Sequence, residues 1–269
     1  MRTKKTVMLC FIISLVTGFL GAALRTVCLL AFYSTESGHF TRGNAGILPD
    51  IAWGACIVGA AAALLICLVN KKPLSNYEEK GGMLYTVGAT LAVCAVLAVI
   101  FESLSAFLNG DPASRTVNMI IVISAFVSCI VLFTNTFFPI KGIDPVRAGI
   151  SLIPAIFVVL PAYRLYFEPT LVMNCPNKNV YILAVCLVAA MIIYEGRFHT
   201  EMRNTALYVA SCCGAFTFGI FCSVPNLIYS AVHGGVSVIN SLAADLLVIC
   251  FAIFAAIQLL SLHRIRNRS

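Results

Sequence analysis

Residues 6–24 read TVMLCFIISLVTGFLGAAL, an apolar run without a single charged residue. A helix needs roughly 20 apolar residues to cross a bilayer, because each residue adds ~1.5 Å across a hydrocarbon core ~30 Å thick. Similar uncharged runs follow at 51–69, 83–101, 116–140 and 204–232. The first run and those that follow it therefore predict an all-α integral membrane protein, a polytopic bundle of transmembrane helices.

The overall composition supports the same class. Of the 269 residues, 60% are hydrophobic and 11% are charged, whereas soluble domains carry about 25% charged residues. The connecting segments are short, and the longest of them, residues 33–46, is too small to form a domain. We therefore expect a single transmembrane helical domain over residues 1–269, with the lipid bilayer as its surroundings.

Turn residues and charges divide the chain into eight predicted spans. A basic segment precedes the first span, as it would in a secretory signal. The apolar run is longer than a signal core of roughly 7–15 residues, and no small-x-small cleavage site closes it, so we expect an uncleaved span. The predicted spans are 6–32, 47–69, 83–107, 116–138, 148–168, 180–195, 204–231 and 236–262.

The basic residues predict the orientation. Of 18 Lys and Arg, 13 fall in the two termini and the even-numbered loops, three in the odd-numbered loops and two within spans. By the positive-inside rule both termini face the cytoplasm. The net charge of +7 then reflects topology and attraction to anionic lipid headgroups, and it requires no nucleic-acid partner. Short loops and many cysteines favour a bacterial cytoplasmic membrane.

No motif of a known chemistry is present in the sequence. P-loop, HExxH, GxSxG and GxGxxG patterns are absent, and the four histidines are scattered. Eleven of the twelve cysteines lie in apolar runs without metal-ligand spacing, as expected for small hydrophobic residues. We therefore expect no catalytic residues, no metal and no cofactor, and we identify no family resemblance.

A weak internal similarity suggests a repeat of four plus four spans in parallel. The charged loops KKPLSNYEEKGGMLYTV (71–87) and EGRFHTEMRNTALYVA (195–210) both lead through Leu-Tyr into the next span. The first and fifth spans each carry one arginine near the outer end, Arg25 and Arg164. Repeats of this kind are common in transporters.

Ionisable residues in or near the membrane are the main functional signal. A charge at the bilayer centre costs about 2.5–3.5 kcal/mol on insertion scales, so such residues usually face partners or water. All of them are predicted in the outer half, and the inner half holds nothing comparable. They are Arg25, Asp50, Glu102, Arg164, Glu168 and Asp245.

Most of these residues also have a structural interpretation. Arg25 and Arg164 could extend outward to lipid headgroups. Arg164 and Glu168 are one helical turn apart, so a local ion pair would explain both, and Asp50 could be a helix N-cap. Asp245, within AADLLVI, has no cation within a turn of its own helix. It therefore needs a partner on another helix, water or a proton.

Two backbone features accompany these charges. Pro225 and Asn226 in the seventh span indicate either a broken helix that lines a cavity or a simple kink. Small residues recur at helical spacing in the second span, at Ala52, Cys56, Gly59 and Ala63. Such a stripe allows another helix to approach closely.

Three functions remain open on the sequence alone, and the first is slightly favoured. It is a small-solute transporter with an outward-facing polar cavity for an anionic solute, where Asp245 exchanges the coupling proton. The second is a non-catalytic membrane subunit that binds a membrane partner or forms a homo-oligomer. The third is a membrane enzyme that acts on lipid-linked substrates. The candidate binding or coupling residues are Arg25, Glu102, Arg164, Asn226 and Asp245.

Overall fold

The computed structural model describes residues 2–34, 37–40, 47–74, 77–79, 83–109, 112–138, 144–167, 175–197, 200, 204–239 and 241–264. Within these residues, eight apolar helical segments are long enough to cross a membrane, which confirms the all-α polytopic class. The fifth of them consists of two consecutive helices. The segments are α1 (Arg2–Phe32), α2 (Leu48–Val69), α4 (Met83–Asn109), α5 (Pro112–Phe137), α6 with α7 (Pro145–Ile150 and Ile153–Tyr166), α8 (Pro176–Gly196), α9 (Thr205–Val232) and α10 (Leu242–Ser261).

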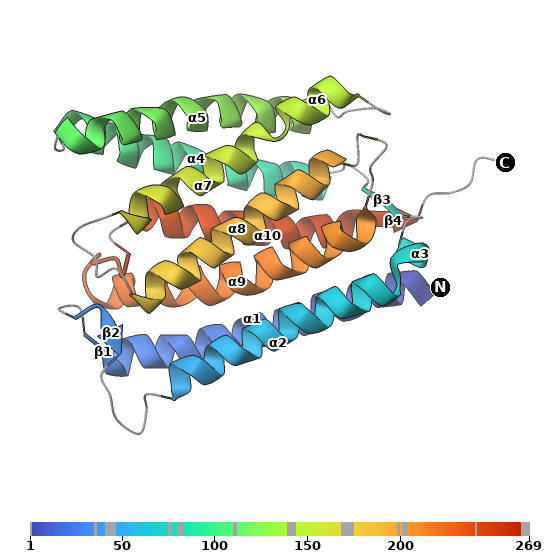
Figure 1. The fold of residues 1–269 in the computed structure, drawn as a ribbon, viewed down its shortest axis with the longest axis horizontal. Coiled ribbons are helices and arrows are strands. Elements are labelled where there is room, and N and C mark those ends of the chain that lie inside the picture. Colours follow the sequence, from blue (N-terminus) through green and yellow to red (C-terminus); the bar gives the residue numbers. More distant parts are fainter. Residues whose placement is uncertain are drawn as a thin grey trace.

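Short elements mark the two ends of the bundle. At one end β1 (Tyr33–Ser34) pairs antiparallel with β2 (His39–Phe40). At the other end, where α1 begins and α3 (Lys71–Leu74) lies, β3 (Tyr77–Glu79) pairs with β4 (Leu262–Arg264) (Figure 1). We call these ends the β1–β2 end and the β3–β4 end.

The helix α9 is the centre of the bundle, and it packs against α1, α2, α8 and α10. Two helical hairpins flank the middle layer on opposite sides: α1 with α2 against α9, and α4 with α5 against α10 and α7 (Figure 1). Most residues of α9 are therefore buried, whereas both hairpins leave long apolar faces exposed, as expected for contact with lipid.

Several helix boundaries differ from the predicted spans, and three of the differences have a clear local cause. Helix α8 begins at Pro176 instead of 180, because proline fits the first turn of a helix, where its missing N–H is not needed. Helix α10 begins at Leu242 instead of 236, because the Ser241 side chain caps it by accepting from the Ala244 N–H. The fifth span is interrupted at Ser151–Leu152, just before Pro154.

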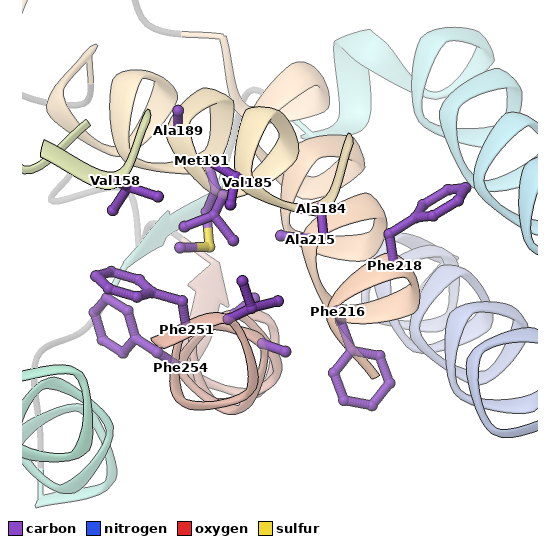
Figure 2. Packing of buried hydrophobic residues seen from close by; sticks show 14 of the residues in the cluster. Val158, Ala184, Val185, Ala189, Met191, Ala215, Phe216, Phe218, Phe251 and Phe254 are labelled. Atoms are coloured by element: carbon purple, nitrogen blue, oxygen red, sulfur yellow. The ribbon is translucent and has the colours of Figure 1, made fainter. Parts of the chain in front are cut away.

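The core between the middle helices is apolar. In Figure 2, Met191 and Val185 of α8 lie opposite Phe251 of α10, whereas Phe216 and Phe218 of α9 point away toward the α1–α2 hairpin. Because lipid tails are as apolar as these side chains, close packing must hold the helices together. Interlocking of large and small side chains at these interfaces provides it.

Small residues bring α1 and α2 together. The stripe predicted in the second span is buried, and a Cβ atom on Gly59 would lie only 2.3 Å from Oγ1 of Thr17. The prediction of a close helix approach is therefore confirmed. Since the partner of the stripe is α1 of the same chain, the stripe does not provide a contact for another protein.

Candidate functional site

Arg25, two turns before the end of α1, points into the protein. Its side chain is only 3% exposed, so the interpretation that it extends outward to lipid headgroups is wrong. One terminal nitrogen, Nη1, donates to the carbonyl oxygens of Phe221 and Cys222, both at 2.7 Å. The other, Nη2, donates to Oδ1 of Asn177 at 2.8 Å and to Oδ1 of Asn226 at 2.9 Å.

Pro225 explains why α9 offers these carbonyl groups. Proline has no N–H, so the carbonyl of the residue four positions earlier, Phe221, loses its helical partner. The Arg25 guanidinium supplies the missing donor. Helix α9 is continuous from Thr205 to Val232, so the broken-helix interpretation of Pro225 and Asn226 is wrong. The proline instead creates an arginine-binding position in an unbroken helix.

Asn226 connects Arg25 to Asp245. Its carbonyl oxygen accepts from Arg25, and its Nδ2 donates to Oδ1 of Asp245 at 2.7 Å. Asp245 is 1% exposed, and its second oxygen, Oδ2, has no hydrogen-bond partner among the described residues. The expected partner on another helix thus exists, but it is a neutral amide.

A second polar cluster contains Arg164 and Glu102. Nη2 of Arg164 on α7 lies 2.7 Å from Oε1 of Glu102 on α4, and Nη1 donates to Oδ1 of Asn118 on α5 at 3.1 Å. Arg164 therefore pairs with a residue of another helix, whereas the sequence suggested a local pair with Glu168. Glu168 itself lies outside the described residues.

Glu102 also binds the start of α10. Ser241 Oγ donates to Oε1 of Glu102 at 2.7 Å, and the Ala243 N–H donates to Oε2 at 3.2 Å. A carboxylate at a helix N-terminus is stabilised by the free N–H groups and the helix dipole. Glu102 thus connects α4, α7 and α10, and Asp245 lies in the first turn of the same α10.

Tyr181 on α8 lies near both clusters. Its side chain is fully buried, and its hydroxyl has no hydrogen-bond partner among the described residues. Asp245, Arg164 and Glu102 all lie within electrostatic range of this hydroxyl. The five predicted site residues thus form two neighbouring clusters, Arg25–Asn226–Asp245 and Arg164–Glu102. The sequence interpretation missed Asn177, because it placed this residue in the loop before the sixth span, and it missed Tyr181, which looked like an ordinary residue at the start of an apolar helix.

A cavity of about 460 Å³ lies beside the first cluster at the β1–β2 end. This volume falls within the ~300–1,000 Å³ typical of small-molecule sites. Asp50 is exposed in the first turn of α2, whose N-cap is Ile47, so the prediction that Asp50 is the N-cap is wrong. The residues that line the cavity are Arg25, His39, Phe40, Pro49, Asp50, Trp53, Pro176, Asn177, Val180 and Phe221.

The β1–β2 hairpin contributes one wall of this cavity through His39 and Phe40. The Sγ of Cys175, the N-cap residue of α8, donates to the Gly38 carbonyl at 3.2 Å and ties the hairpin to α8. Tyr33 packs edge-on against Phe40 at 5.7 Å between ring centroids. Burial raises the pKa of the Tyr33 hydroxyl to about 12, and the Cys175 thiol adds to this effect.

The β3–β4 end also contains a carboxyl group inside a helix. Oε1 of Glu195, near the end of α8, accepts from the Tyr85 hydroxyl at 2.9 Å, and Gln258 on α10 is buried beside them. The expectation that the inner half holds nothing comparable is therefore wrong. The sequence placed Glu195 in a loop because the sixth span was predicted to end there.

Comparison with protein-family models, with curated proteins and with solved structures finds no match to this chain. The function must therefore be argued from the geometry of the site.

Proposed function

We propose that this protein is a small-solute permease whose binding site is the cavity at the β1–β2 end. One observation supports this function above the others: Arg25 forms part of the cavity wall, and hydrogen bonds connect its guanidinium through Asn226 to Asp245 in the core. A change at the cavity can thus reach a buried ionisable group through two hydrogen bonds. If Arg25, Asn226 and Asp245 only stabilised the fold, their network would not need to begin at a cavity.

The proposed orientation places both termini in the cytoplasm of a bacterial cell and the cavity on the outside. Two observations support it. The start of α1 and the strand β4 lie opposite the cavity, at the β3–β4 end (Figure 1). The loops and termini of that end carry 13 of the 18 Lys and Arg residues.

The proposed parallel repeat would relate the two arginines. Arg25 on α1 and Arg164 on α7, the first and fifth spans, each donate to an asparagine at the same end of the bundle. Arg164 also pairs with Glu102, whereas Arg25 is connected to Asp245 only through Asn226. In this proposal the first arginine serves the cavity, and the second holds α4 against α7 and α10.

Asp245 is the proposed coupling group. Its carboxyl group contacts an amide and no cation among the described residues, so it can gain or lose a proton without breaking an ion pair. Proton exchange there would alter the Asn226 amide and, through it, the position of Arg25. This gives a physical route from proton binding to solute binding.

Uptake by purified protein in proteoliposomes tests this function. A mixture of small metabolites is offered at several external pH values, and accumulated solutes are identified by mass spectrometry. We expect pH-dependent uptake that Asp245→Asn makes independent of pH. The control, Asp144→Asn, places an equally good capping residue before α6 and should behave as wild type. Unchanged pH dependence in Asp245→Asn, or co-purification of a stoichiometric partner without any uptake, would contradict the proposal.

A further inference from the structure

The wall of the cavity is chemically divided. The buried side carries the guanidinium of Arg25 and the amide of Asn177, whereas the exposed start of α2 carries the carboxylate of Asp50. Aromatic rings connect these two regions: Cζ of Arg25 lies 5.3 Å from the centroid of the Phe221 ring, and the Phe221 ring lies 5.9 Å from that of Trp53, while Phe40 also lines the cavity. A ligand that fills this space would meet a cation at one end, an anion at the other, and aromatic faces in between.

The Arg25 side favours an anionic group. All four hydrogen bonds of the guanidinium go to neutral oxygens, so no carboxylate among the described residues contacts it directly. Its Nε–H is the remaining donor. The first turn of α8, with Pro176 and Asn177, lies beside it, and its helix dipole adds positive potential.

The Asp50 side favours a cationic group. Among the described residues that line the cavity, Asp50 is the one carboxylate. Trp53 follows three positions later, so both side chains lie on one face of α2. The face of a tryptophan ring is the strongest aromatic binder of ammonium groups. The Trp53 ring is held in place by Phe218 and Phe221, at 5.7 and 5.9 Å between centroids.

We propose that the cavity binds a small zwitterion, with its anionic group toward Arg25 and its ammonium group between Asp50 and Trp53. This inference rests on the proposed permease function and specifies its substrate class. A free solute of the amino-acid or betaine type has this chemistry, and so does the headgroup of a zwitterionic phospholipid. A simple anion, which the two arginines suggested in the sequence, would leave Asp50 without a partner.

Ligand binding to full-length protein in dodecyl maltoside tests the proposal, with thermal stabilisation as the readout. The soluble probes are the amino acids with uncharged side chains and glycine betaine. The lipid probes are phosphatidylethanolamine and phosphatidylcholine, compared with anionic phosphatidylglycerol. We expect saturable stabilisation by at least one zwitterionic probe. Stabilisation by soluble probes identifies a free solute, and stabilisation by the lipids alone identifies a headgroup.

The charge requirement is tested on the tightest soluble binder or lipid by blocking each charge in turn. For an amino acid these probes are its N-acetyl and its amide derivative. For a lipid they are N-acyl phosphatidylethanolamine, which loses the ammonium, and O-ethyl phosphatidylcholine, a phosphotriester that loses the anionic charge and keeps the ammonium. Each blocked probe should bind at least tenfold more weakly than the zwitterion, the effect expected for one lost charge-assisted contact.

Asp50→Asn locates the ammonium group within the cavity. Because Asp50 is exposed, this variant should fold normally. It should weaken binding of the zwitterion about tenfold and leave binding of the amine-blocked probe unchanged, whereas Asp50→Glu should restore part of the affinity. Asp144→Asn, the same change at the β3–β4 end, should have no effect.

Three results would overturn the proposal: no stabilisation by any zwitterionic probe, equal binding of the blocked probes, or binding that is insensitive to Asp50→Asn. These results are distinguishable from failure of the permease function itself. Uptake of a solute with one kind of charge would disprove the zwitterion and keep the permease. A zwitterion that binds through Asp50 but is never taken up would disprove transport and keep the site.

Discussion

At the scale of single residues, the pairing of Arg25 with the backbone of α9 is the contact on which the site depends. Arg25 donates a hydrogen bond to the carbonyl of Phe221, which Pro225 leaves without a helical partner. A buried carbonyl without a donor is unfavourable by about 1–3 kcal/mol. Arg25 therefore compensates for the N–H that Pro225 lacks, although the two residues are far apart in sequence and lie on different helices.

A double-mutant cycle measures this coupling. Arg25→Met should destabilise the protein strongly when Pro225 is present. In the Pro225→Ala background, the new N–H of residue 225 can donate to the Phe221 carbonyl, so the same change should destabilise less, by about 1–3 kcal/mol. The measurement is unfolding in dodecyl maltoside with increasing dodecyl sulfate.

Pro161 provides a matched control, because it lies inside α7, whereas the hydrogen bonds of Arg25 among the described residues go to α8 and α9. Arg25→Met and Pro161→Ala should add within about 0.5 kcal/mol. If the Pro225 cycle is equally additive, Arg25 does not stabilise the freed carbonyl, and the explanation of its burial fails.

The sequence singled out the charged residues within the spans, and it misjudged where Arg25 and Arg164 point. Arg25 and Arg164 were recognised as unusual, because charges in apolar runs are rare. Their partners on α4, α5, α8 and α9 could not be predicted, since a sequence displays only pairs on one helix, such as Arg164 with Glu168. Whether an arginine extends to lipid headgroups or binds an asparagine on another helix can be predicted only when the neighbouring helices are known.

At the scale of helices, the contact between α1 and α2 depends on the absence of side chains. A Cβ atom on Gly59 would meet Thr17 Oγ1 at 2.3 Å, which forces the two helices apart. Gly54, one turn away on the same helix, has no atom within 4 Å of its Cβ position. The two glycines therefore have the same helix propensity, but only Gly59 is packed closely against another helix.

Substitution by alanine separates these effects. Gly59→Ala should destabilise the protein by about 1–3 kcal/mol, as overpacking does. Gly54→Ala should be neutral or stabilising by about 0.5–1 kcal/mol, because alanine is the better helix former. Unfolding of both variants in the same detergent mixture provides the comparison. Equal effects in both variants would mean that α1 and α2 do not pack as closely as described.

The apolar runs predicted the helices, because the length of a span is set by the bilayer. The sequence was less reliable at helix ends. The break before Pro154 reflects the missing N–H of proline, and the late start of α10 at Leu242 depends on the Ser241 cap. Hydropathy reports neither of them. The stripe at Gly59 was correctly interpreted as a close approach, but the sequence did not identify α1 as its partner.

At the scale of the whole molecule, the two polar clusters and the cavity lie at one end, and the start of α1 and β4 lie at the other. The direction in which the cavity opens therefore depends on the orientation of the whole bundle. The distribution of Lys and Arg is the physical basis for the proposed orientation, since basic loops are retained on the cytoplasmic side.

Reporter fusions in a bacterial host test this orientation. Green fluorescent protein fused after Ser269 should fluoresce, because it folds in the cytoplasm. Alkaline phosphatase fused after Asn109, at the β1–β2 end of α4, should be active, because it requires export. The exchanged fusions should both be inactive. If the activities are reversed, the cavity faces the cytoplasm, and Arg25 and Asp50 would bind a solute on its way out of the cell.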